Sequence, residues 1–361
     1  MGELMSKFMT LEDHFARLHP VRPEHDAARL LWQDRLAPEL TTMEEERKAV
    51  IKRATMHTVA TAAFIVALVF AAIIAFGFEA IFPFGIFAGI VGIFIACAAV
   101  WMPVFSMKSQ TKQLVVGAAC EPFGFTYSTL HQDLSGVSSL RSLGSWVNAN
   151  KSAVFSKGNE PPTPAFERLK TVGLMPSYDS RKFEDLIEGV RADAAFTMVE
   201  CKLTEQQGSG KNRRTVTKFQ GLLLNIEYPE RFLGRTLLAR DGWWSWGRKN
   251  GMQQVQLVSK ELEDAFTVYS TDQVEARTLL TPDRMERLIA LERHFKGSKL
   301  RGVFEEGHLT IALEADNQFE AGSIFKPLID PARYVETLTE IGLICDLIDG
   351  FLTRDWYKDK I

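Results

Sequence analysis

The chain has 361 residues, enough for one medium-sized domain or two small ones with a buried core. Its 42 lysines and arginines nearly balance 45 aspartates and glutamates, which argues against a protein whose main activity is nucleic-acid binding. The cysteines are far apart and form no CxxC pair, which predicts a reducing compartment and no disulfide framework. They are Cys97, Cys120, Cys201 and Cys345.

Residues 1–55 are predicted to form a cytoplasmic segment of short helices. Thr10 and Asp13 have the spacing of an N-cap pair, and Pro23 stands where the first turn of a helix tolerates proline. The charged run EEERKAVIKR, residues 44–53, contains no helix breaker. We therefore expect its helix to continue without interruption into the apolar residues that follow.

Two long uncharged stretches come next, with 25 residues between Arg53 and Glu79 and 28 between Glu79 and Lys108. A helix rises about 1.5 Å per residue, so about 20 apolar residues cross a hydrocarbon layer of ~30 Å. Helices buried in soluble proteins rarely stay apolar on every face for such a length. The sequence therefore predicts a transmembrane helical hairpin over residues 56–105.

Basic residues flank the two apolar stretches on their outer sides. Lys52 and Arg53 precede the first stretch, Lys108 and Lys112 follow the second, and the connection at residues 77–85 contains no Lys or Arg. The positive-inside bias predicts a multi-pass membrane protein with both termini in the cytoplasm. The uncharged interiors disfavour an ion pathway. A Gly-x-x-x-Gly spacing in the second stretch permits close helix packing and leaves homo-oligomers open.

Residues 106–164 are predicted to form a juxtamembrane helix and a linker, and residues 165–361 a cytoplasmic α+β domain. Alternating apolar residues and turn signals predict about seven short, mainly antiparallel strands. The strands are expected at residues 194–203, 217–228, 235–240, 254–259, 266–270, 302–306 and 309–315. Helical periodicity predicts helices from Thr281 to His294 and from Pro331 to Leu352. This order is compatible with a PH-like sandwich closed by a long C-terminal helix.

The stretch EQQGSGKNRR, residues 205–214, resembles a phosphate-binding loop in part. Glu205 and Asn212 stand where that motif needs Gly and Ser or Thr, and a strand follows where a helix is required. A solvated hairpin tip is therefore the favoured interpretation. Its basic residues are candidate contacts for an acidic partner or for lipid headgroups: Lys211, Arg213 and Arg214.

The stretch GWWSWG, residues 242–247, has one residue too many for the Gly-x-Ser-x-Gly of a nucleophile elbow. Indole rings with adjacent cations suit a membrane interface or a protein contact, and packing into the domain's own core is the alternative. The candidate contact residues are Trp243, Trp244, Trp246, Arg248 and Lys249.

The run from Phe266 to Leu288 is the most densely patterned part of the chain. The helix dipole favours acidic residues at the start of a helix, and Pro282 suits a first helical position. A structural role is therefore available for each polar residue of this run. The conspicuous members are Tyr269, Asp272, Glu275, Arg277 and Pro282. We predict no catalytic, cofactor-binding or metal-ligating residue from the sequence.

This run also carries a resemblance to a known family. The segment VYSTDQVEARTLLTP (268–282), together with KFQGLLL (218–224) and LTIALEADNQFE (309–320), resembles the bacterial family catalogued as domain of unknown function number 3137. The resemblance covers roughly residues 45–350. It implies a membrane hairpin followed by a cytoplasmic domain at the inner membrane, with no activity or catalytic residues to transfer. It also implies a LemA-type membrane protein as a partner.

These observations favour a membrane-anchored binding or scaffolding protein that contacts the lipid bilayer. The alternative is a membrane-anchored hydrolase whose site is assembled from dispersed residues. Convergent carboxylates with shifted pKa values in a pocket would favour the hydrolase. An exposed apolar patch without such a pocket would favour the binding module.

Overall fold

The computed structural model describes most of the chain. It leaves out residues 1–9, 19–20, 77–83, 131–164, 229–230, 241–250, 258–259, 321–324 and 353–361.

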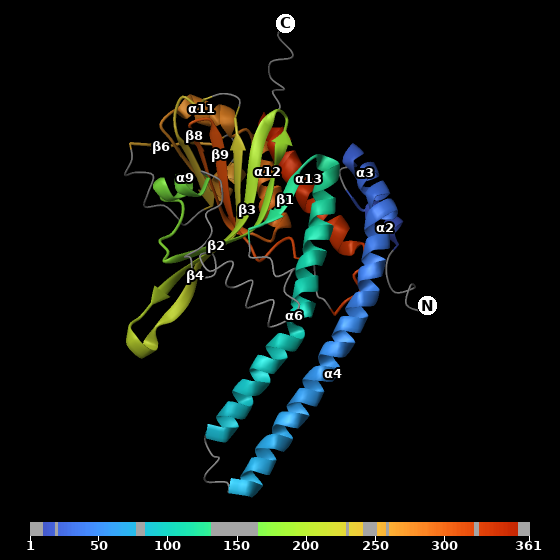
Figure 1. Cartoon of the computed structure of the whole chain (residues 1–361). Helices are drawn as coiled ribbons and strands as arrows, with labels where there is room; N and C mark the ends of the chain where they lie inside the picture. The colour runs from blue at the N-terminus through green and yellow to red at the C-terminus, as the bar shows by residue number, and fades with distance from the viewer. Residues whose placement is uncertain are drawn as a thin grey trace.

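Two long helices lie side by side and project from a folded body (Figure 1). The first belongs to a continuous helical run made of α3 (Pro23–Leu31), a π-helical turn (Trp32–Leu36) and α4 (Ala37–Phe76). The second is α6 (Phe84–Cys120). The indole Nε1 of Trp101 in α6 donates to the Thr58 hydroxyl of α4 at 3.0 Å, which ties the two helices together. The expected continuation of residues 44–53 into the first apolar stretch is confirmed, because α4 contains both, and the predicted juxtamembrane helix is the last part of α6.

The body is built on one antiparallel sheet of nine strands, in the order β1-β2-β3-β4-β9-β8-β5-β7-β6. The strands are β1 (Thr126–Thr129), β2 (Ser180–Arg191), β3 (Ala194–Gln207), β4 (Arg214–Glu227), β5 (Thr236–Arg240), β6 (Gln253–Gln254), β7 (Phe266–Ser270), β8 (Ser298–Glu305) and β9 (His308–Glu314). The helices of the body are α2 (Leu11–Phe15), α9 (Ala165–Thr171), α10 (Lys260–Ala265), α11 (Gln273–Leu279), α12 (Pro282–His294) and α13 (Ala332–Leu352).

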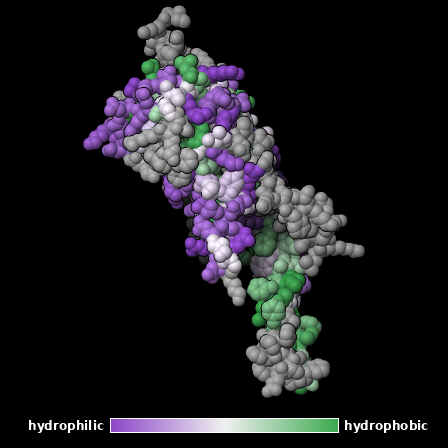
Figure 2. Space-filling view, turned by 90° about the vertical axis from the view of Figure 1, so that its left-hand side faces the viewer, coloured by the Kyte–Doolittle hydropathy of each residue, from purple (hydrophilic) through white to green (hydrophobic). Residues whose placement is uncertain are grey.

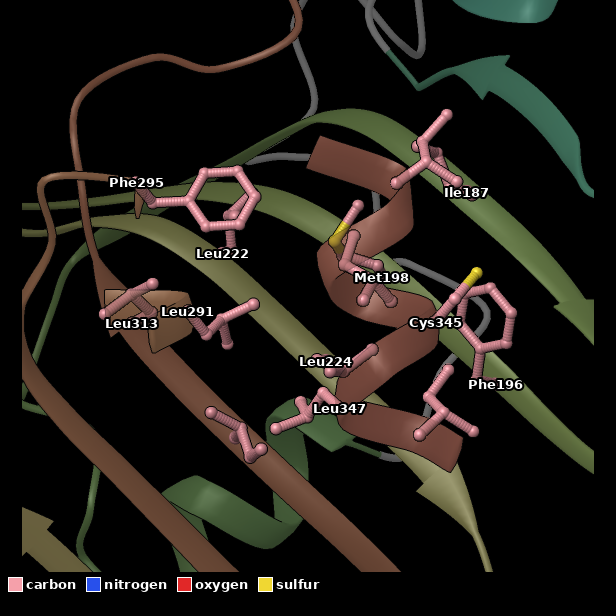
Figure 3. Close-up of a cluster of buried hydrophobic side chains, with 14 of the residues drawn as sticks. Ile187, Phe196, Met198, Leu222, Leu224, Leu291, Phe295, Leu313, Cys345 and Leu347 are labelled. Carbon is pink, nitrogen blue, oxygen red and sulfur yellow. The ribbon is translucent and has the colours of Figure 1, made fainter. Parts of the chain in front are cut away.

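The two faces of the sheet pack against different layers, because side chains alternate along each strand. Phe196 and Met198 of β3 point to the face covered by α12 and α13, where they meet Leu291 and Leu347 (Figure 3). On the opposite face, side chains such as Val199 pack with α9 and the residues up to Met175. Since helices cover both faces of one sheet, the two facing sheets of a PH-like sandwich are not what the described strands form.

The α+β class and the long C-terminal helix are confirmed, and β3, β4, β5, β7, β8, β9, α12 and α13 lie where the sequence predicts them. The sequence prediction of about seven strands omits β1 and β2. Strand β2 is rich in charge, and a bulge between Phe183 and Leu186 interrupts its alternation. Strand β1 lies within the segment interpreted as helix and linker, yet it pairs with β2.

The N-terminal helices pack on the C-terminal helix of the body. Arg22 donates to the Gly342 carbonyl at 2.9 Å and forms an ion pair with Asp346. The Tyr334 hydroxyl donates to the Ala28 carbonyl, and its ring lies 5.3 Å from that of Trp32. Segments on both sides of the long helices thus build one hydrophobic core.

Replacing Leu347 by Ala tests this core. Leu347 is fully buried between α13 and the sheet, so Leu347→Ala should lower the free energy of unfolding by about 2–5 kcal/mol. Leu233→Ala is the control, because Leu233 is 86% exposed and should change stability by less than about 0.5 kcal/mol. Urea unfolding of the detergent-solubilised protein, followed by circular dichroism, measures both. Equal effects of the two variants would contradict this packing.

Candidate functional site at the junction of helix α6 and the sheet

A buried polar cluster joins α6 to the edge of the sheet. The ammonium group of Lys112, near the end of α6, donates to Asp185 Oδ2 at 2.7 Å. The hydroxyl of Tyr127 in β1 donates to the other carboxylate oxygen of Asp185, also at 2.7 Å. Asp185 is 3% exposed, so its charge is compensated by these two donors rather than by water.

Glu200 completes the cluster from β3. Burial, together with the neighbouring Asp185, raises the pKa of Glu200 to about 9, so this side chain keeps its proton at neutral pH. The protonated carboxyl donates to Asp185, and its Oε1 accepts from the backbone N–H of Gln318 at 2.8 Å. Two carboxyl groups therefore share a closed site with one negative charge, and Lys112 balances that charge.

A second set of contacts lies one helical turn away on α6. The Lys108 ammonium group lies 2.8 Å from Glu320, and that of Lys112 lies 3.9 Å from the same carboxylate. Burial would raise the pKa of Glu320, but the hydrogen bond and charge of Lys108 and the charge of Lys112 hold it below its usual value. Glu320 thus bridges the two lysines.

Helix α4 is attached to the body through the segment before α13. The buried Glu44 carboxylate is paired with Arg47 at 2.6 Å and accepts from the backbone N–H of Leu328 at 3.0 Å. The ring of Phe325 lies 6.0 Å from that of Trp101 in α6. This segment therefore contacts both long helices, α4 through Leu328 and α6 through Phe325.

The polar cluster contains the carboxyl groups that an acid–base site needs, but a substrate cannot reach them from solvent. Asp185 and Glu200 are 3% and 2% exposed, which leaves no room for a substrate beside them. Cavities of about 330 and 220 Å³ in the described part of the chain are lined by other residues. The oxygens of Glu184, Asp185 and Glu200 lie within 4.8 Å of one another, as in a metal site, but Lys112 already supplies the positive charge. The arrangement suits a structural junction.

The structure places the conspicuous residues of the 266–288 run at separate points of the fold. Asp272 caps α11, since it accepts from the backbone N–H groups of Val274 and Glu275 at 2.9 Å. Glu275 in turn accepts from the backbone N–H groups of Leu233 and Gly234 at 2.7 and 2.9 Å.

The remaining members of that run do not converge with these two. Tyr269 is buried on the sheet face that α9 covers, and Arg277 donates to Gln273 at 3.3 Å. Pro282 begins α12, as the sequence predicts.

The candidate contact residues fall into two groups. Arg213 and Arg214 are exposed at the tip of the β3–β4 hairpin, and Lys211 lies in the same turn. The tryptophan-rich stretch, with Trp243, Trp244, Trp246, Arg248 and Lys249, lies outside the described residues.

Sequence analysis missed the polar cluster, although one signal was present. Phe196, Met198 and Glu200 occupy alternate positions of a predicted strand, so they share a face. A charged residue in such an apolar row is expected to be buried with partners. Those partners, Lys112 and Asp185, are far away in the sequence, and no local pattern connects them to Glu200.

Comparison with known proteins supports the family resemblance. Residues 217–352 match the family described as Protein of unknown function (DUF3137). The matched region begins in β4 and ends at the last residue of α13, while α4, α6 and strands β1–β3 precede it. The resemblance is thereby confirmed for its C-terminal part.

Two further comparisons add no argument about function. The chain is similar to the crystal structure of the mycobacterial trehalose monomycolate transport factor A, TtfA, with 11% identity and a TM-score of 0.32. The similarity covers 68% of this chain and 96% of that one. A TM-score this low does not establish a common fold. A comparison with curated proteins gives no match.

Replacing Lys112 by Met tests the junction. The substitution leaves Asp185 buried beside Glu200 without its cation, so Lys112→Met should lower the free energy of unfolding by about 3–5 kcal/mol. Lys108→Met is the matched control, because the Lys108–Glu320 pair is partly exposed and should contribute about 1 kcal/mol or less. Urea unfolding at neutral pH distinguishes them. A Lys112→Met variant as stable as Lys108→Met would contradict the assigned role.

The proton on Glu200 gives a second prediction. The unfolded chain loses this proton near the usual pKa of 4.5, whereas the folded chain keeps it to about 9. Between these values the folded state binds more protons, so stability falls as pH rises, by up to about 1.4 kcal/mol per pH unit. Gln cannot ionise and still donates to Asp185. Glu200→Gln should therefore be more stable than the wild type, increasingly so as pH rises through this window.

Thermal unfolding of Glu200→Gln at several pH values within this window measures the effect. The exposed Glu286 on α12 supplies the control, and Glu286→Gln should follow the wild-type pH dependence. A constant difference between Glu200→Gln and the wild type at every pH would show that Glu200 is ionised in the folded state.

Proposed function

We propose that the chain is a membrane-anchored binding or scaffolding protein, in which residues 56–105 span a bilayer and the body is held at its surface. The observation that carries this proposal is the exposure of apolar side chains along the helix pair. The most apolar 18-residue stretch of the first helix has no buried residue, and a quarter of the corresponding stretch of α6 is buried. The core helix of a soluble protein would be mostly buried, whereas lipid accepts such a surface.

The attachment of the chain ends supports the orientation. Arg22 precedes the helix pair and Asp346 follows it, yet they form an ion pair within one body. Both segments must therefore lie on the same side of a bilayer that the pair crosses. The basic residues that flank the apolar stretches favour the cytoplasm as that side, by the positive-inside bias. The short connection between the helices then lies on the far side.

The junction supports a holding role rather than a catalytic one. The contacts of Lys112, Glu44 and Phe325 fix the body relative to the helices, so its outer surface keeps a defined orientation to the bilayer. Restricting a module to a membrane raises its effective concentration for membrane partners. The hydrolase alternative needs a substrate to reach convergent carboxylates, but Glu200, whose pKa is raised, and the neighbouring Asp185 are both buried.

An exposed apolar pair in the region that matches the DUF3137 family offers a contact for a partner. Val274 on α11 and Leu233 are 75% and 86% exposed. They are neighbours, because the backbone N–H of Leu233 donates to Glu275, the residue after Val274. The expected partner is an integral membrane protein, of LemA type if the family resemblance extends to partners.

The full-length protein should remain in the membrane fraction after a carbonate wash, because transfer of the helix pair to water would expose its apolar surface. A photo-crosslinker at Val274 in cells should then capture a membrane protein, identified by mass spectrometry. A crosslinker at Val268, a buried residue of β7, is the control and should capture nothing.

Two results contradict the proposal separately. Release of the intact protein by a carbonate wash would contradict the proposal that residues 56–105 span the membrane. Retention in the membrane, no capture from Val274 or Leu233, and turnover of a metabolite by the purified protein would favour the hydrolase.

A further inference from the structure

The β3–β4 hairpin extends well beyond the rest of the sheet. Its last buried pair is Leu203 and Phe219, and the residues from Gln206 to Thr217 are exposed or half-buried where their side chains are described. Figures 1 and 2 show the hairpin projecting on the side of the body from which the helix pair leaves. An antiparallel extension this long, free of the core, has a surface role rather than a packing role.

The tip of this hairpin is strongly basic within a chain of net charge −3. From Glu205 to Ile226 the sequence contains four basic residues and one acidic residue, Glu205, which gives a local charge of +3. Glu205 is paired with Lys218 at 3.1 Å. The other basic residues of the tip are Lys211, Arg213 and Arg214, and the two arginine side chains are exposed.

The position of the tip follows from the polar cluster. Lys112 of α6 and Glu200 of β3 both contact Asp185, so they lie at one level. From Glu200 to Gln207, β3 advances by about 23 Å at ~3.3 Å per residue. From Lys112 back to Trp101, α6 covers about 17 Å at ~1.5 Å per residue. The hairpin is therefore long enough for its tip to reach the region of α6 around Trp101.

That region is where the surface of the helix pair changes from polar to apolar. Figure 2 shows the hydrophilic hairpin descending to the level at which the hydrophobic surface of the helices begins. Trp101 and Phe325, which is 64% exposed, form an aromatic contact there. Aromatic rings of this kind are enriched at the headgroup level of a bilayer.

We propose that the tip formed by Lys211, Arg213 and Arg214 binds anionic lipid headgroups of the bilayer that the helix pair spans. This inference rests on the proposed membrane anchor and adds the class of ligand. Phosphate oxygens of the lipid accept hydrogen bonds from guanidinium groups. An acidic protein would require no particular level for the tip, whereas headgroups are available only at the level where it lies. The body thereby rests on the membrane at a point away from the helix pair.

A fluorescent probe at Ser209, in the tip, tests the contact with the full-length protein in lipid nanodiscs. Cys97→Ala removes the half-buried cysteine, and the other three are buried, with burial raising the pKa of Cys120 and Cys345 to about 12. A Ser209→Cys label should be quenched by headgroup nitroxides about fivefold more in phosphatidylglycerol-containing discs than in phosphatidylcholine discs. High salt should remove the difference. Ala192→Cys, in the exposed turn at the other end of β3, is the matched control without quenching.

Charge variants identify the residues responsible. Arg214→Glu should reduce the quenching at Ser209 in anionic discs to the level in neutral discs. Arg277→Glu changes the same charge at an exposed position of α11 and should leave the quenching unchanged. Both variants should unfold at the wild-type temperature, because the two arginines are exposed.

Each remaining outcome overturns a defined statement. Equal quenching in both lipids overturns the assignment to anionic headgroups. Absence of quenching at Ser209 in protein that resists carbonate extraction overturns the tip contact and leaves the anchor in place. Extraction by carbonate overturns the anchor itself.

Discussion

The ion pair between Lys112 and Asp185 is the contact on which the assembly of the molecule depends. Asp185 is buried beside Glu200, and removal of its cation would leave an uncompensated charge inside the protein. The cation comes from α6, which also forms half of the apolar helix pair. The sheet edge at β1 and β2 is therefore complete only when α6 is in place, and the body and the helix pair are parts of one folding unit.

The same dependence explains why the N-terminal helices belong to the body. Arg22 binds Gly342 and Asp346 within α13, and the Glu44 carboxylate of α4 accepts a hydrogen bond from the segment that leads into α13. The body therefore contains chain from before and after the helix pair. The core of the body can form only when the segment before the helix pair and the segment after it lie next to each other. The connectivity thus brings the two ends of the helix pair into one body.

Local sequence patterns predicted the parts of the fold that local physics decides. Strand β7 has clean alternation, and α12 begins at a Pro after Thr281, so both were found at their observed positions. Strand β2 was missed because Asp185, at the bulge of this strand, is buried through its ion pair with Lys112 of α6, and the sequence of β2 alone does not show this contact. The polar cluster was missed for the same reason. The burial of Glu200 can be explained only by its neighbours Lys112 and Asp185, and these three residues come together only in the folded chain.

A buried network at this place also restricts how α6 can slide. Apolar contacts along a long helix change little if it moves by one turn, about 5.4 Å, because similar side chains replace one another. Such a shift would separate Lys112 from Asp185 and also disrupt the bridge from Glu320 to Lys108 and Lys112. The loss of paired charge in a closed site opposes the shift much more strongly than packing does. The polar cluster therefore sets the height of the body above the apolar surface of the helix pair, and with it the level that the basic hairpin tip reaches.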